Sequence, residues 1–172
     1  MKKYLLTAMV ALMSLTASAQ VYVGGELGFW RNPDANTTQF QLSPEIGYNL
    51  SQDWALGLNL SYAYNYRNGA DANTVAVAPY ARYSYAQWGP VRLFVDGGFG
   101  FKSIKIDDAD AVNGWEIGLR PGLSVSVTDK LNFISHVGFL GYRDTEEIGG
   151  EGHGFGFFLS GQELTFGIQY NF

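Results

Sequence analysis

A sparse set of charged side chains of both signs occupies alternate positions in segments whose remaining positions are apolar or small. Carboxylates and guanidiniums that share an interior must meet one another, because a buried charge without a partner is costly. This pattern predicts that ion pairs between these side chains fill the interior of the fold. We expect a lumen charge network formed by Glu26, Glu45, Arg82, Arg92, Asp96, Lys102, Glu116, Arg120 and Glu163.

Catalytic groups are scarce in the sequence. His136 directly follows Ser135, and neighbouring strand residues point to opposite faces, so the two cannot form a nucleophile–base pair. We interpret His136 as a lumen histidine with satisfied hydrogen bonds. His153 lies in an acidic segment near Asp144 and Glu151, and Ser160 lies on the next strand, so these residues could form the rim site of a lipid-modifying enzyme or protease. Polar loops bring such residues together by chance, and we therefore predict no catalytic residues and no enzymatic activity.

The segments that carry these charges alternate with a period of two residues, which is the period of a β-strand. Residues 54–66 are the clearest case, with an aromatic residue or leucine at every even position and small or polar residues between. The same alternation predicts eight strands in all. They are residues 21–30, 39–50, 54–66, 74–86, 91–101, 114–127, 131–142 and a last strand that follows 143–154 and ends at 172.

The predicted connections alternate between short turns and longer loops. Turns of three or four residues lie at 51–53, 87–90 and 128–130, and longer loops at 31–38, 67–73, 103–113 and 143–154. Three predicted strands also contain a proline on their apolar face, at Pro44, Pro79 and Pro121. Because proline cannot donate a ladder hydrogen bond, we predict a ring of irregular strand pairing at these positions.

The N-terminal residues indicate that the protein is exported from the cytoplasm. Lys2 and Lys3 precede a short apolar core, and Ala17-Ser18-Ala19 is a small-residue cleavage site, so residues 1–19 read as a secretory signal peptide and 20–172 as one β-barrel domain. The chain has no cysteine and no apolar run long enough for a membrane-spanning helix. Without Lys2 and Lys3, the chain has 11 − 2 = 9 basic and 16 acidic side chains, so its net charge is 9 − 16 = −7. That balance argues against nucleic acid as a partner, because its phosphates need Lys and Arg.

Two fold classes share this strand pattern: a soluble lipocalin-like barrel and a transmembrane barrel. They differ in whether the apolar face points inward or outward. The charged face here is too sparse for a surface in water, and aromatic residues gather near the strand ends, as membrane interfaces require. We therefore predict an all-β fold, an eight-stranded antiparallel up-and-down transmembrane β-barrel preceded by a cleaved signal peptide.

The last strand carries a family resemblance. Thr165, Gly167, Tyr170 and Phe172 match the polar, glycine and terminal aromatic positions of the signal that the outer-membrane assembly machinery reads. With the segment 43–48, they make the chain resemble the outer membrane protein beta-barrel domain family, and it is similar in layout to the small eight-stranded barrels of outer membrane proteins A and X. The resemblance implies the outer membrane of a Gram-negative bacterium and carries no catalytic residues.

The functional expectation follows from a lumen filled with charge. We expect a plugged barrel acting as a structural or surface-interaction protein, in adhesion or envelope integrity, through its extracellular loops. A narrow porin-like channel for very small solutes remains the alternative. The expected partners are outer membrane lipid and lipopolysaccharide, the assembly machinery through the C-terminal strand, and a host or surface ligand at the loops, with the chain itself monomeric.

The acidic loops suggest a further partner. They could hold a divalent cation that bridges to lipopolysaccharide phosphates, but their spacing does not match a calcium-binding loop. We therefore expect solvated loops, with no metal and no cofactor. The residues concerned are Asp107, Asp108, Asp110, Asp144, Glu146, Glu147 and Glu151.

Deletion of Phe172 is expected to lower insertion into the outer membrane, because the resemblance makes the terminal aromatic part of the assembly signal. The fraction of heat-modifiable, folded barrel in isolated outer membranes measures this. Any activity of the loops, normalised to the barrels that do insert, should be unchanged. Unimpaired assembly of the deletion variant would contradict the prediction.

Overall fold

The alternating segments are strands throughout the part of the chain that the structure describes. This computed structural model describes residues 20–172 apart from 34–35, 68, 108–109, 146–152 and 159–163, so the predicted signal peptide lies outside the described residues. Within these limits no helix is long and apolar enough to cross a membrane. The strands are β1 (Val21–Asn32), β2 (Thr37–Asn49), β3 (Trp54–Arg67), β4 (Ala70–Trp88), β5 (Val91–Ile106), β6 (Val112–Ser126), β7 (Leu131–Val137), β8 (Phe139–Thr145), β9 (Gly154–Phe158) and β10 (Leu164–Asn171).

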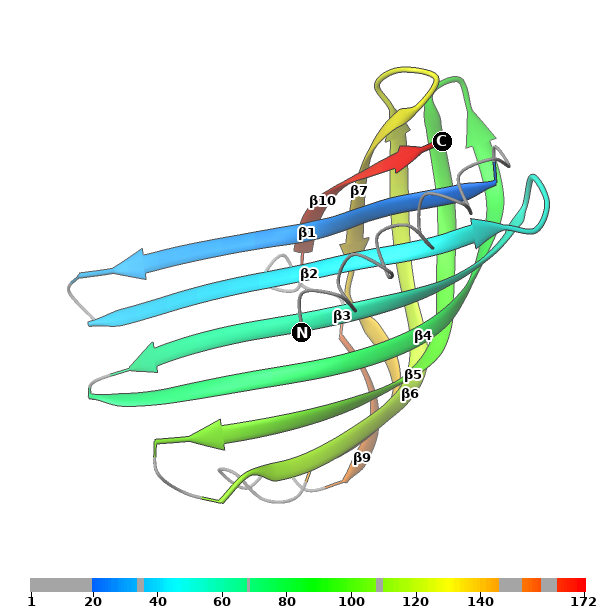
Figure 1. Ribbon diagram of the computed structural model, residues 1–172. Coiled ribbons are helices and arrows are strands. Elements are labelled where there is room, and N and C mark those ends of the chain that lie inside the picture. Colours follow the sequence, from blue (N-terminus) through cyan, green and yellow to red (C-terminus); the bar gives the residue numbers. More distant parts are fainter. Residues whose placement is uncertain (1–19, 34–35, 68, 108–109, 146–152, 159–163) are drawn as a thin grey trace, which may run out of the picture.

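These segments close into an antiparallel barrel (Figure 1). Each of β1 to β6 pairs with the next, and β10 pairs with both β7 and β1. β7 and β8 follow one another along β6, while β9 continues the position of β10 by pairing with β8. The ten segments therefore occupy eight barrel positions, which confirms the predicted eight-stranded fold.

The seam that closes the barrel lies between the first and last strands. The register runs from Tyr22 opposite Asn171 to Glu26 opposite Gly167. The backbone N–H of Phe172 also donates to the carbonyl oxygen of Val21, at 3.1 Å. A Cβ at Gly167 would lie 2.4 Å from the Gly25 carbonyl oxygen, so the seam closes only with glycine there.

The three prolines mark irregular pairing, as predicted. The β2–β3 ladder is interrupted at Pro44, and the β4–β5 ladder is interrupted at Pro79. Beside Pro121, β6 changes partner from β7 to β8, and Gly138, with a φ of 89°, separates those two segments. Since proline offers no N–H to the neighbouring strand, each ladder loses its hydrogen bonds at this level.

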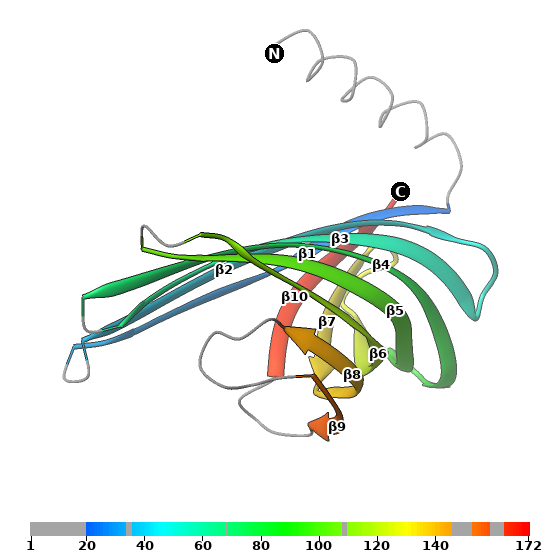
Figure 2. The same cartoon turned by 90° about the horizontal axis from the view of Figure 1, so that it is seen from below.

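The predicted long loops at 31–38, 67–73 and 103–113 are wrong. Strand pairing continues through most of these residues, and the connections shrink to 33–36, 68–69 and 107–111. Polar residues pair as well as apolar ones once the ladder is established, and Asn36 and Gly69 supply the positive φ that tight turns need. The three hairpins project side by side at the end away from the C-terminus (Figures 1 and 2). We call this the far end, and the opposite one the terminal end.

The sign of the alternation separates a membrane barrel from a soluble one. Outward apolar side chains are exposed, with 49% of Leu56, 59% of Val75 and 61% of Ile168 accessible. Inward charged side chains are buried, with 7% of Arg82 and 6% of Asp96 accessible. A barrel in water would show the reverse arrangement, so lipid is the solvent of the outer face. The long strands agree, since β4 has 19 residues and about 9–11 suffice to cross a bilayer.

Gly167→Ala is expected to destabilise the folded barrel by about 1–3 kcal/mol, because the new methyl group overlaps the backbone of β1. Urea unfolding in lipid vesicles, followed by tryptophan fluorescence, measures the change. Gly28→Ala is the matched control on β1, since its Cβ would meet the Gln41 side chain at an ordinary 3.6 Å. Equal stability of the two variants would contradict this account of the seam.

Candidate functional site

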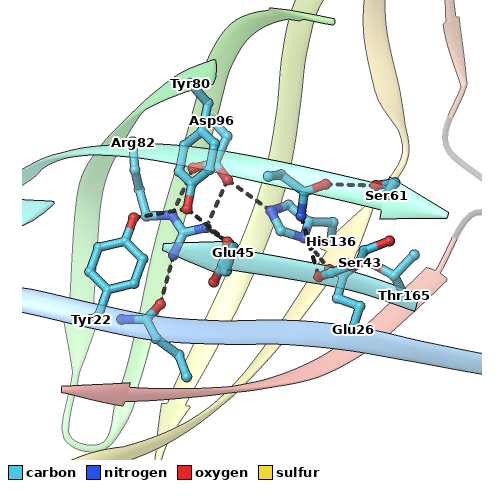
Figure 3. A network of polar contacts seen from close by, with 12 residues as sticks. Tyr22, Glu26, Ser43, Glu45, Ser61, Tyr80, Arg82, Asp96, His136 and Thr165 are labelled. Carbon is cyan, nitrogen blue, oxygen red and sulfur yellow. Dashed lines mark hydrogen bonds and ion pairs between the residues drawn. The ribbon is translucent and has the colours of Figure 1, made fainter. Parts of the chain in front are cut away.

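A buried arginine crosses the lumen at mid-height. Arg82, on β4, donates from Nε to Asp96 Oδ1 at 2.7 Å and from Nη2 to Asp96 Oδ2 at 2.8 Å. Its Nη1 donates to Gln169 Oε1 on β10, at 2.9 Å. The guanidinium also lies over the ring of Phe94, 4.1 Å from its centroid. Arg82 therefore ties together strands from opposite sides of the barrel (Figure 3).

A chain of hydroxyl groups joins this arginine to the first two strands. The hydroxyls of Tyr22 and Tyr80 are 2.8 Å apart, and Tyr80 donates to Glu45 Oε2 at 2.7 Å. Glu45 Oε2 lies 3.8 Å from an Arg82 nitrogen. Facing glycines make room for both rings, since a Cβ at Gly47 would lie 2.1 Å from Tyr22 and one at Gly57 would lie 2.3 Å from Tyr80.

His136, on β7, bridges two carboxylates. Its Nδ1 lies 2.8 Å from Glu26 Oε1, and its Nε2 lies 2.9 Å from Asp96 Oδ2. Thr165 donates from Oγ1 to the same Glu26 oxygen, at 2.8 Å. The reading of His136 as a hydrogen-bonded lumen histidine is confirmed. We call the connected group the central cluster; it comprises Tyr22, Glu26, Glu45, Tyr80, Arg82, Asp96, His136, Thr165 and Gln169.

A second ionic group lies nearer the far end. Glu116 contacts Arg120, four residues along β6, and also accepts a hydrogen bond from Arg143 Nε on β8 at 3.1 Å. The Arg143 guanidinium lies over the Phe139 ring, 4.1 Å from its centroid. A cavity of about 360 Å³ is lined by this group and by the central cluster.

The terminal end holds a second polar cavity, of about 530 Å³. It is lined by Arg82, by the Phe94 ring beneath it and by Arg92. Arg92 donates to the Gln52 carbonyl oxygen and to Gln87 Oε1, both at 3.0 Å. The central cluster therefore lies between two polar cavities. Buried hydrogen-bonded ion pairs of this kind rigidify an interior, and losing one partner is costly.

The predicted network divides in the structure. Glu26, Glu45, Arg82 and Asp96 come together in the central cluster, and Glu116 pairs with Arg120 in the second group. Arg92 and Lys102 share the inward parity, but within the described residues neither forms an ion pair with a carboxylate. Arg92 lies at the lumen mouth, and Lys102 lies level with Ala76 and Gly114. Glu163 lies outside the described residues.

Sequence reasoning omitted several members of the network. Tyr22 and Tyr80 share the inward parity of Glu26 and Arg82, and this parity was the signal that could have identified them. Arg143 fell in a segment read as a loop, although it belongs to β8. Thr165 and Gly167 of the assembly-signal positions face the lumen beside Glu26, whereas Tyr170 and Phe172 are exposed on the outer face.

The candidate rim and metal residues are only partly described. His153 is exposed and Asp144 belongs to β8, while Ser160 and Glu151 lie outside the described residues. Asp108, Glu146 and Glu147 also lie outside them. Among the residues that are described, no three acidic or histidine side chains are placed to hold a metal ion.

The model of the outer membrane protein beta-barrel domain family matches residues 4–172. The chain belongs to this family. It is an outer membrane β-barrel protein of Gram-negative bacteria, and its exposed apolar face lies in the lipid and lipopolysaccharide environment of that membrane. No curated protein matches the chain.

Two solved structures share the fold of this outer membrane barrel. Neisserial surface protein A is 15% identical with a TM-score of 0.61, and the match covers 90% of this chain and 98% of that one. The N-terminal β-barrel domain of Pseudomonas aeruginosa OprF is 18% identical with a TM-score of 0.52, again covering 90% and 98%. At these identities the likeness is one of fold.

Arg82→Met is expected to destabilise this outer membrane barrel by about 3–5 kcal/mol, because it leaves Asp96 buried without its cationic partner. Urea unfolding in vesicles measures the loss. Arg92→Met is the control, with an expected change within about 0.5 kcal/mol, since no carboxylate depends on it. The double variant Arg82→Met/Asp96→Leu should lose less stability than Arg82→Met alone. Equal losses for Arg82→Met and Arg92→Met would contradict the role of the cluster.

Proposed function

We propose that this protein is an integral outer membrane barrel with a plugged lumen, acting as a structural or surface-interaction protein. Its role in this proposal is adhesion or envelope integrity, exercised through the extracellular loops toward a host or surface ligand. The observation that supports it is the central cluster, in which Arg82 contacts Asp96 and Gln169 from strands across the lumen. An eight-stranded barrel is just wide enough for side chains to fill it.

The proposal includes an orientation and a route of assembly. In this proposal residues 1–19 act as a cleaved signal peptide, the terminal end of the barrel faces the periplasm, and the far end lies outside the cell. The assembly machinery reads the C-terminal strand, where Tyr170 and Phe172 present exposed aromatic rings. The barrel works as a monomer, since β1 and β10 pair with each other along Tyr22–Glu26 and so cover that strand edge.

Enzymatic activity is not part of the proposal. The lumen carboxylates and His136 are engaged with one another and with Arg82 and Thr165, which suits a structural network. A catalytic acid or base must instead reach a substrate.

A narrow channel for very small solutes is the second candidate. The two polar cavities, of about 360 and 530 Å³, favour it, because members of the central cluster line both of them. Water or small ions could fill both cavities and would need to pass the central cluster. The two candidates therefore differ in whether the cluster opens.

Conductance across a planar bilayer distinguishes the plugged barrel from the channel. The purified wild-type barrel is expected to give no discrete current steps, because the Arg82 contacts hold the lumen closed. The variant Arg82→Ala is the sensitivity control, since it removes the side chain that crosses the lumen. Reproducible current steps from the wild-type protein would overturn the plugged-lumen proposal and favour the channel.

The loop proposal is tested on cells. Replacing the β8–β9 connection with a short glycine–serine linker is expected to reduce surface attachment or resistance to detergent, while the amount of folded barrel stays the same. A linker of matched composition in place of 51–53, at the terminal end, is the control. Unchanged attachment and unchanged detergent resistance after replacement of all four far-end connections would contradict the proposal.

A further inference from the structure

The lipid-facing surface carries a groove of about 590 Å³ in the half of the barrel toward the far end. The side chains that line it are almost entirely apolar and come from β2, β3, β4 and β5, with β6 closing one end. A groove of this size is not expected on the convex outer surface of a barrel. Its structural cause and the ligand that could fill it are therefore of interest.

Strand register explains how the groove forms. Outward side chains stand in rows that cross the strands, because paired residues lie side by side. One row toward the far end consists of Tyr62, Val75, Ser103 and Asn113. The next row toward the terminal end consists of Leu60, Val77 and Phe101. The floor between them is Ser61, Ala76, Lys102 and Gly114, which point the other way.

The size and the lining of the groove suit a hydrocarbon chain. Its volume is about 590 Å³, and its side chains present almost only apolar surface. Pro44 lies at one end of the groove, where the β2–β3 ladder is interrupted. Barrel strands tilt by about 35–45° from the membrane normal, so a groove that crosses them also slopes through the leaflet, as an inclined acyl chain does.

A cationic side chain stands directly above the groove. Lys105 is the next outward residue after Ser103 on β5, toward the far end, and it is exposed. It pairs with Asn73 on β4, whose Oδ1 accepts a hydrogen bond from the Tyr62 hydroxyl at 2.7 Å. Lys105 and Asn73 therefore lie just beyond the far-end wall of the apolar groove, with the Tyr62 hydroxyl bonded to Asn73. The phosphate headgroup of a lipid lies in the same position relative to its acyl chain.

Two carboxylates lie farther out on the same rim. The Asp71 backbone N–H donates to Asp107 Oδ1 at 2.9 Å, and both residues come after Lys105 toward the far end. Their charge would repel a phosphate that moved past Lys105. They therefore limit how high the headgroup can sit, and they keep the phosphate at the level of the lysine.

We propose that this groove binds one acyl chain of lipid A, the phosphate-bearing anchor of lipopolysaccharide, with Lys105 contacting a phosphate. The lipid environment of the barrel is general, whereas this site is a single place with a defined headgroup contact. It rests on the proposed orientation, which puts the far end in the outer leaflet, and on no part of the proposed loop function.

Native mass spectrometry of the folded, full barrel in detergent tests the site, with purified bisphosphorylated lipid A as the probe. The wild-type barrel is expected to retain one lipid A saturably and in preference to phosphatidylethanolamine. Lys105→Gln should weaken binding about fivefold, the effect of one cationic contact at a membrane surface. Ser103→Phe, which fills the groove from its wall, should weaken binding at least as much. Lipid A without phosphates should bind the wild type about as weakly as lipid A binds Lys105→Gln.

Matched controls separate the site from general effects of charge and bulk. Lys130→Gln removes an exposed lysine at the terminal end, and Ala81→Phe adds the same ring on an outward position of β4 outside the groove. Both should bind lipid A within twofold of wild type, and all variants must show the heat-modifiable folded form. Equal binding by Lys105→Gln, by Ser103→Phe or by phosphate-free lipid A would overturn the proposal. Such a result would leave the conductance and loop experiments unaffected.

Discussion

The buried guanidinium of Arg82 organises this barrel. It donates two hydrogen bonds to the Asp96 carboxylate and one across the lumen to Gln169, and it lies over the Phe94 ring. Asp96 in turn contacts His136, which contacts Glu26 on the first strand. Because an uncompensated charge in a narrow lumen is costly, the members of this cluster depend on one another. The walls are thus joined through the lumen as well as around it.

Backbone irregularity and the polar interior occur at the same level. The prolines immediately precede Glu45 and Tyr80 on β2 and β4, and Pro121 immediately follows Arg120 on β6. Interrupted ladders there let strands bend while the lumen side chains hold the walls together. At the level of the prolines, side-chain contacts of the central cluster stabilise the barrel where backbone hydrogen bonds are missing. The central cluster also lies between the two polar cavities. The same residues therefore close the lumen and support the irregular strands.

The outer face and the lumen present different chemistry to different partners. The central cluster offers charges that are already paired, which suits support better than transport. The outer face offers apolar rows with a groove between two of them and Lys105 above it. The groove would recognise one specific lipid by its shape and by one charge. The rest of the outer surface contacts bulk lipid through hydrophobic side chains alone.

The two-residue alternation by itself determined the number of barrel strands and the inward parity of Glu26, Glu45, Arg82 and Asp96. These features are local, because side-chain direction in a strand depends only on position along it. Tertiary structure decided which charges meet. Arg92 and Lys102 share the inward parity but lie at other levels, and partners depend on register between strands far apart in the sequence. Register likewise extended the hairpins through predicted loops and aligned the rows that form the lipid-facing groove.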